Sequence, residues 1–143
     1  MPGIRHPSII NGLPVVSAPA EIDTITAEKL RLVLLGTAAN GHATVVVDLT
    51  GTRYCDSSGL EMLAGAHRRA LDEGGELRLV LAADGPVIRV LALTTLDRFI
   101  PCFTSLDQAL GAPLPTAVPP SPPHLWHQPR SNPRQPGRQP EEA

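Results

Sequence analysis

Apolar residues in the first 111 positions form either short continuous runs or longer segments in which they recur every three or four residues. Short runs indicate strands, and the recurring spacing indicates helices. The runs predict strands at 7–10, 13–18, 43–49, 76–82 and 99–103. The recurring spacing predicts helices from Asp23 or Thr24 to Asn40-Gly41, from Ser58 to Gly74-Gly75, from Pro86, and from Ser105 to Leu110.

Strands and helices follow one another in turn after an opening hairpin, whose Asn11-Gly12 pair is typical of a two-residue turn. This order predicts an α/β fold, with a mixed sheet of about four to five strands packed with about four helices. Residues 43–49 are apolar without alternation, which indicates a central strand covered on both faces. Cys55 and Cys102 lie in apolar surroundings, which favours buried free thiols over a disulfide and fits a reducing compartment.

The composition of the chain changes near Gly111. Of its 16 prolines, most lie beyond that residue, in a segment with almost no apolar periodicity. Such a segment cannot bury enough surface to fold, so we expect a domain at 1–111 and a disordered, proline-rich tail at 112–143. Within the tail, His124 and His127 flank Leu125-Trp126. Two histidines are an incomplete metal-ligand set, and a short docking segment is the other interpretation.

Charge and hydropathy exclude several classes of protein. The net charge of −2 argues against nucleic acid as a partner, because binding phosphates requires a basic surface. The sequence has no apolar run near the roughly 20 residues that span a bilayer. Its first residues also lack the long apolar stretch of a signal peptide. We therefore expect a cytoplasmic protein.

The segment YCDSSGLEML, at 54–63, places two serines at the start of a predicted helix. Ser58 and Glu61 fit the S-x-x-E capping box, so Ser58 is expected to cap the helix. This leaves Ser57 without a structural role, one residue before the cap. A phosphate there would add a charge of about −1.5 to −2. The positive helix N-terminus tolerates an anion, so Ser57 could be phosphorylated reversibly without unfolding the domain.

An enzymatic role for these serines lacks the necessary partners. The nucleophile elbow requires G-x-S-x-G, and neither serine has a glycine two residues before it. His67 is about three helical turns from Ser57, too far to act as its base, and is interpreted as a partly buried residue on the helix face. The sequence also contains no phosphate-binding G-x-x-x-x-G-K-[ST] loop. We expect no catalytic residues, no metal and no cofactor.

Acidic residues recur at a second strand-to-helix junction. Glu21 and Asp23 stand between a strand and a helix, as Asp56 and Ser57 do one unit later. If the two strands are parallel neighbours, both loops emerge at the carboxyl edge of the sheet, where binding sites gather. The four side chains would then form one acidic patch that carries a hydroxyl. Two independent helix caps explain the same spacing equally well.

Residues 13–110 resemble the STAS domain, the anti-sigma factor antagonist family of bacteria. The D-S-S-G-L element after an apolar strand is the specific part of the resemblance. One departure is Ala20, where the family commonly has a glycine. The matching segments, in the expected order, are AEIDTITAEKL, VVVDLTGTRYCDSSGLEML, GGELRLV and LDRFIPCFTSLDQAL.

The resemblance implies a non-catalytic switch that regulates transcription. A serine kinase, which is also the anti-sigma factor, would use ATP and Mg²⁺ to phosphorylate Ser57, with Ser58 as the alternative. The unmodified antagonist would bind that kinase and indirectly free a sigma factor, and a phosphatase would restore it. Partner binding is expected at Glu21, Asp23, Asp56, Ser57 and Ser58. The alternative is a structural STAS subunit of a lipid-transport complex, which is not phosphorylated.

Overall fold

A computed structural model describes residues 7–115. Their main sheet has five strands in the order β1-β2-β4-β6-β7. β1 and β2 are antiparallel and the other neighbours are parallel, so the sheet is mixed, as predicted. The strands are β1 (Ser8–Ile10), β2 (Leu13–Ser17), β4 (Val45–Asp48), β6 (Leu77–Val80) and β7 (Cys102–Phe103). The segment at 124–127, with its incomplete metal-ligand set and its interpretation as a docking segment, lies outside the described residues.

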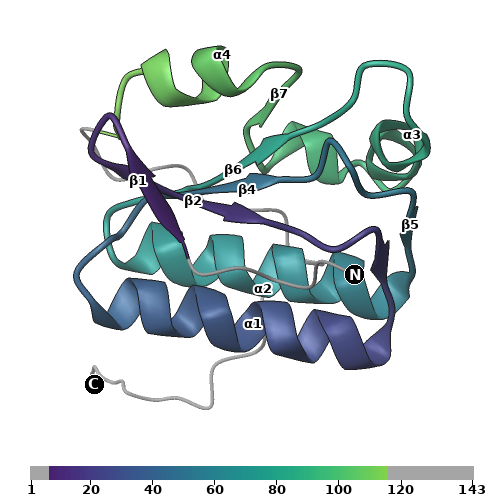
Figure 1. Ribbon diagram of the computed structural model, residues 1–143, viewed down its shortest axis with the longest axis horizontal. Helices are drawn as coiled ribbons and strands as arrows, with labels where there is room; N and C mark the ends of the chain where they lie inside the picture. Colours follow the sequence, from purple (N-terminus) through teal and green to yellow (C-terminus); the bar gives the residue numbers. More distant parts are fainter. Residues whose placement is uncertain (1–6, 116–143) are drawn as a thin grey trace, which may run out of the picture.

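The helices form layers on both faces of the sheet. Two long helices lie side by side on one face and a short one covers the other (Figure 1). Pro86 is the first residue of its helix, as predicted. The last helix begins at Leu106, one residue later than predicted, because Ser105 is its cap. The helical elements are α1 (Thr24–Ala39), α2 (Ser57–Asp72), α3 (Pro86–Leu93), the 3₁₀ turn η1 (Leu96–Arg98) and α4 (Leu106–Gly111). No helix within residues 7–115 is both long and apolar enough to cross a membrane.

The central strand β4 is buried on both faces, which confirms the prediction from its unbroken apolar run. Val45 and Val47 belong to the larger core cluster, together with residues of α1 and α2. Val46 belongs to a smaller cluster on the other face, together with Ala109 of α4. Since successive side chains of a strand point to opposite faces, a strand between two layers needs apolar residues at every position.

One arginine lies inside this core, a feature that the apolar pattern of the strand did not indicate. Arg78 of β6 is fully buried. Its Nε donates to Glu76 Oε2 at 2.7 Å. Its terminal nitrogens donate to the carbonyl oxygens of Ala109 at 2.6 Å and Pro113 at 2.7 Å. Arg78 therefore ties α4, and the chain that leaves it, to the middle of the sheet.

A buried histidine joins α2 to the sheet. The Leu77 N–H donates to His67 Nδ1 at 3.1 Å. Burial lowers the pKa of His67, although a hydrogen bond with the Phe99 backbone and the nearby charge of Glu76 act in the opposite direction. Because Nδ1 accepts a hydrogen bond, the neutral imidazole is the form that fits this position. His67 is thus a structural residue of the helix face, buried more deeply than the sequence suggested.

Candidate functional site

The two predicted strand-to-helix junctions lie next to each other. β3 (Glu21–Ile22) and β5 (Tyr54–Cys55) form a separate two-stranded parallel sheet, in which Glu21 is opposite Tyr54 and Ile22 is opposite Cys55. β3 leads into α1 and β5 leads into α2, so both helices begin at one edge of the molecule (Figure 1). The condition for a shared patch, two parallel neighbouring strands, is therefore met. We call this region the Ser57 edge, defined by Glu21, Asp23, Asp56, Ser57 and Ser58.

The first junction has the geometry that the sequence predicted. Asp23 is the N-cap of α1, and its Oδ1 accepts hydrogen bonds from the N–H groups of Ile25 at 3.0 Å and Thr26 at 2.9 Å. The Thr26 hydroxyl accepts from the Asp23 N–H at 2.9 Å, which completes a capping box. Hydrogen bonds from Thr26 hold the pKa of Asp23 below its usual value, so this carboxylate stays charged. Ala20 does not have a positive φ, so its departure from glycine causes no strain.

The second junction corrects one prediction. The N-cap of α2 is Asp56, whose Oδ1 accepts from the Gly59 N–H at 3.2 Å. Ser58 is already the second residue of the helix, so the expected Ser58–Glu61 capping box is wrong. The physical reason is that Asp56 caps as well as serine does and stands directly after β5. The chain therefore enters the helix two residues earlier than the S-x-x-E pattern indicated.

The two serines have different surroundings. Ser57, the first residue of α2, is exposed, and no group within residues 7–115 makes a hydrogen bond to its hydroxyl. Ser58 is half-buried, and its Oγ lies 3.2 Å from Oγ1 of Thr24, the first residue of α1. One hydroxyl is therefore open to solvent, while the other links the first turns of two helices.

Close packing beneath the serines fixes the first turn of α2. A Cβ atom placed on the buried Gly59 would lie 2.5 Å from Cys55 Sγ and 2.7 Å from Ile22 Cγ2.

Burial, together with the charge of Asp56, raises the pKa of the Cys55 thiol to about 11. Burial likewise raises that of Cys102 to about 12, with a contribution from Asp97. Both thiols are free, as predicted, although Cys102 is only half-buried. Neither is a reactive thiolate at neutral pH.

We expect Gly59→Ala to destabilise the domain by about 1–3 kcal/mol, because overpacking forces its neighbours apart. The control is Gly65→Ala in the same helix, where a Cβ atom would meet no other group within 4 Å. Replacing a helical glycine at such an open position stabilises by up to about 1 kcal/mol. Urea unfolding of the two variants measures the difference. Equal stabilisation by both would contradict the tight contact at Gly59.

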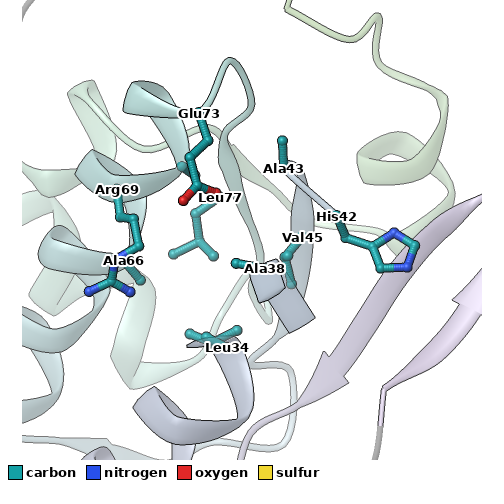
Figure 2. A pocket seen from close by; sticks show the side chains of 10 residues that line it. Leu34, Ala38, His42, Ala43, Val45, Ala66, Arg69, Glu73 and Leu77 are labelled. Atoms are coloured by element: carbon teal, nitrogen blue, oxygen red, sulfur yellow. The ribbon is translucent and has the colours of Figure 1, made fainter. Parts of the chain in front are cut away.

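The described residues also contain a small hollow between the C-terminal halves of α1 and α2 (Figure 2). Ser57 lies at the opposite end of α2. Figure 2 shows aliphatic side chains lining it, including Leu34, Val45 and Leu77, with Arg69 and Glu73 at its margin. Its volume of about 20 Å³ has room for about one water molecule, which is too small for a substrate. Residues 7–115 contain no group of three His, Cys, Asp or Glu side chains arranged to hold a metal ion.

Sequence reasoning missed two large side chains beside the Ser57 edge. Tyr54 is 53% exposed and Ile25 is 67% exposed. For Ile25 there was a signal in the sequence, because it falls outside the helical spacing of the buried residues Ala27, Leu30 and Leu34. For Tyr54 there was none, since a strand of two residues has no readable period.

Comparison with known proteins identifies the family to which this fold belongs. The STAS domain family model matches residues 6–109. Anti-sigma-F factor antagonist RsfB of Mycobacterium tuberculosis is 32% identical over 101 residues, which are 70% of this chain and 80% of that protein. A crystal structure of an anti-sigma factor antagonist from Mycobacterium paratuberculosis is 30% identical with a TM-score of 0.65, covering 73% of this chain and 87% of the other.

The chain therefore belongs to the STAS domain family and, within it, to the anti-sigma factor antagonists. More distant structures share the fold alone. The phosphorylated form of the Bacillus cell fate determinant SpoIIAA has a TM-score of 0.57 at 17% identity, and the match covers 76% of this chain and 96% of that one. Membership of the anti-sigma factor antagonists places the protein among regulators of transcription.

Proposed function

We propose that this protein is a phosphorylation-controlled anti-sigma factor antagonist. In its unmodified form it binds an anti-sigma factor that is also a serine kinase, and it thereby releases a sigma factor. The kinase supplies ATP and Mg²⁺ and phosphorylates Ser57, which ends the binding, and a phosphatase restores the active form. The contact surface is the Ser57 edge. The names of RsfB and of the Mycobacterium paratuberculosis protein support the antagonist role.

The observation that carries the proposal is the exposed Ser57 hydroxyl, which has no hydrogen-bond partner among residues 7–115. A kinase must bring the acceptor hydroxyl in line with the γ-phosphate of ATP, so the hydroxyl must be reachable and not engaged elsewhere. Ser57 meets this requirement better than Ser58, which is half-buried against Thr24.

The position of Ser57 also suits a modification that leaves the domain folded. Ser57 is the first residue of the 16-residue helix α2, where unpaired N–H groups and the helix dipole favour negative charge. A phosphate of about −1.5 to −2 charge is therefore compatible with the fold. Consistent with this, SpoIIAA, which shares the fold, has a structure in the phosphorylated form.

The test is to incubate the full chain with ATP, Mg²⁺ and each anti-sigma kinase of the same genome, and to locate the phosphate by mass spectrometry. Trypsin cuts after Arg53 and Arg68, so one peptide carries both serines. Fragment ions that separate Ser57 from Ser58 are therefore required. We expect a single phosphate on Ser57 and none on Ser57→Ala.

Phosphate on Ser58 in the unsubstituted chain would contradict the assignment of the acceptor. A kinase that binds the chain without modifying it would contradict the switch itself. If no anti-sigma kinase bound or modified the chain, the antagonist role would fail, and the alternative function, a structural STAS subunit of a lipid-transport complex, would be favoured.

A further inference from the structure

We propose that two exposed apolar side chains, Tyr54 and Ile25, anchor the anti-sigma kinase on the Ser57 edge. The inference rests on the proposed function and adds to it which residues supply the binding energy. It also specifies the chemistry of the kinase surface, which must have an apolar recess beside its nucleotide site. The carboxylates of the Ser57 edge then orient the bound kinase and contribute less to its affinity.

The geometry of the two short strands places Tyr54 outward beside Glu21. In the parallel pair β3 and β5, opposite residues point to the same side. Ile22 and Cys55 both point inward to the core, whereas Glu21 and Tyr54 are both exposed. Tyr54 is the only tyrosine of a chain with 3% aromatic residues, and it lies on the surface two residues before Asp56.

Ile25 lies in the first turn of α1, next to the same edge. It follows Thr24, whose hydroxyl lies 3.2 Å from Ser58 Oγ, so the first turns of α1 and α2 are in contact. The Ile25 N–H donates to the cap Asp23, which fixes the backbone at this position. Its side chain is 67% exposed. Ile25 and Tyr54 thus come from neighbouring strand-to-helix units, Ile25 one residue after Thr24 and Tyr54 three residues before Ser57.

These features define the partner surface. Tyrosine is one of the residue types that most often dominate binding energy in interfaces, where its ring fills a desolvated pocket. Aliphatic anchors contribute in proportion to the apolar area removed from water. Glu21 lies beside Tyr54, so a lysine or arginine at the rim of the recess complements it. The kinase surface that fits is an apolar recess with a cation on the Glu21 side and the nucleotide opposite Ser57.

The experiment measures the dissociation constant of full-length variants, by calorimetry, with the kinase identified in the phosphorylation assay. We expect Tyr54→Ala to weaken binding about 30-fold and Ile25→Ala about tenfold. Tyr54→Phe keeps the ring and is expected to bind within about threefold of the original chain. The matched control is Leu32→Ala, since Leu32 is 54% exposed on the same helix but about 10 Å farther along it. It is expected to bind within about twofold.

In the kinase reaction, Tyr54→Ala should raise KM for the chain and leave kcat unchanged, because the anchor contributes equally before and during phosphoryl transfer. Circular dichroism verifies that each variant is folded. Binding within twofold for both Tyr54→Ala and Ile25→Ala, together with loss of binding in Ser57→Asp, would overturn the inference and leave the proposed function standing. If the original chain bound no anti-sigma kinase, the proposed function itself would be wrong, and the inference would be overturned with it. A dimer of the original chain that Tyr54→Ala dissociates would assign the surface to a second copy, and would also overturn the inference.

Discussion

Ser57→Asp is expected to weaken binding of the anti-sigma kinase by about a hundredfold or more, whereas Ser57→Ala binds it constitutively. The Ser57 edge already carries the carboxylates of Glu21, Asp23 and Asp56, and Asp23 is held in its charged form. In the proposed complex, the phosphates of the nucleotide held by the kinase would face Ser57. A further anion at Ser57 is repelled by both sets of negative charges when the kinase docks, and like-charge juxtaposition in an interface costs several kcal/mol. At about 1.4 kcal/mol per tenfold change, this corresponds to a hundredfold loss or more.

The measurement is a titration of each variant against the kinase in the presence of ADP and Mg²⁺. An acidic residue in the first turn of a helix is favourable by about 0.3–1 kcal/mol. Ser57→Asp should therefore be at least as stable as the original chain, and unfolding cannot account for a loss of binding. The control is Leu32→Asp, which adds the same charge at an exposed position of α1 outside the Ser57 edge and is expected to leave binding unchanged. Equal affinity of Ser57→Asp and Ser57→Ala would contradict the electrostatic switch.

The sequence was sufficient to predict the architecture, because burial on both faces of the sheet leaves a direct trace in the apolar pattern. The run at 45–47 is continuous because Val45 and Val47 contact the layer of α1 and α2, and Val46 contacts the layer of α4. The hairpin was predictable for a local reason, since Asn11 and Gly12 both adopt the positive φ that its turn requires.

The finer geometry of the site depended on tertiary contacts that no local pattern records. β3 and β5 have two residues each, and they are strands only because they pair with each other. The start of α2 was misplaced because Asp56 and Ser58 are equivalent caps on local grounds. β5 ends at Cys55 and leads directly into the helix, so Asp56 is the residue that caps it. The exposure of Tyr54 likewise follows from its pairing with Glu21 and not from the neighbouring sequence.

Arg78 is a further case. The sequence predicted its strand correctly but did not indicate which groups pair with its buried charge. Its position in LRLV indicated a strand, and charged residues are almost never fully buried unless they are paired. The structure supplies the pair: the Glu76 carboxylate, and the carbonyl oxygens of Ala109 and Pro113. The partners at Ala109 and Pro113 are more than 30 residues away in the sequence, so only the fold brings them to Arg78.

Arg78→Met is therefore expected to lower the free energy of unfolding by about 3–5 kcal/mol, the usual effect of removing one partner from a buried pair. Methionine fills much of the same space but leaves Glu76 and two carbonyl oxygens without their donor. The matched control is Arg31→Met, since Arg31 forms a similar pair with Glu28 at 2.6 Å on the exposed surface of α1. Such pairs contribute about 0–1 kcal/mol. Urea unfolding followed by far-ultraviolet circular dichroism compares the two variants.

The double variant Arg78→Met/Glu76→Gln separates the charge from the carbonyl contacts. It removes the unpaired carboxylate that the single variant leaves behind, so part of the lost stability should return. The remaining loss then belongs to the unsatisfied carbonyl oxygens of Ala109 and Pro113. If Arg78→Met were no more destabilising than Arg31→Met, Arg78 would not hold α4 on the sheet. The smaller core cluster around Val46 would then have to retain α4 through apolar contacts alone.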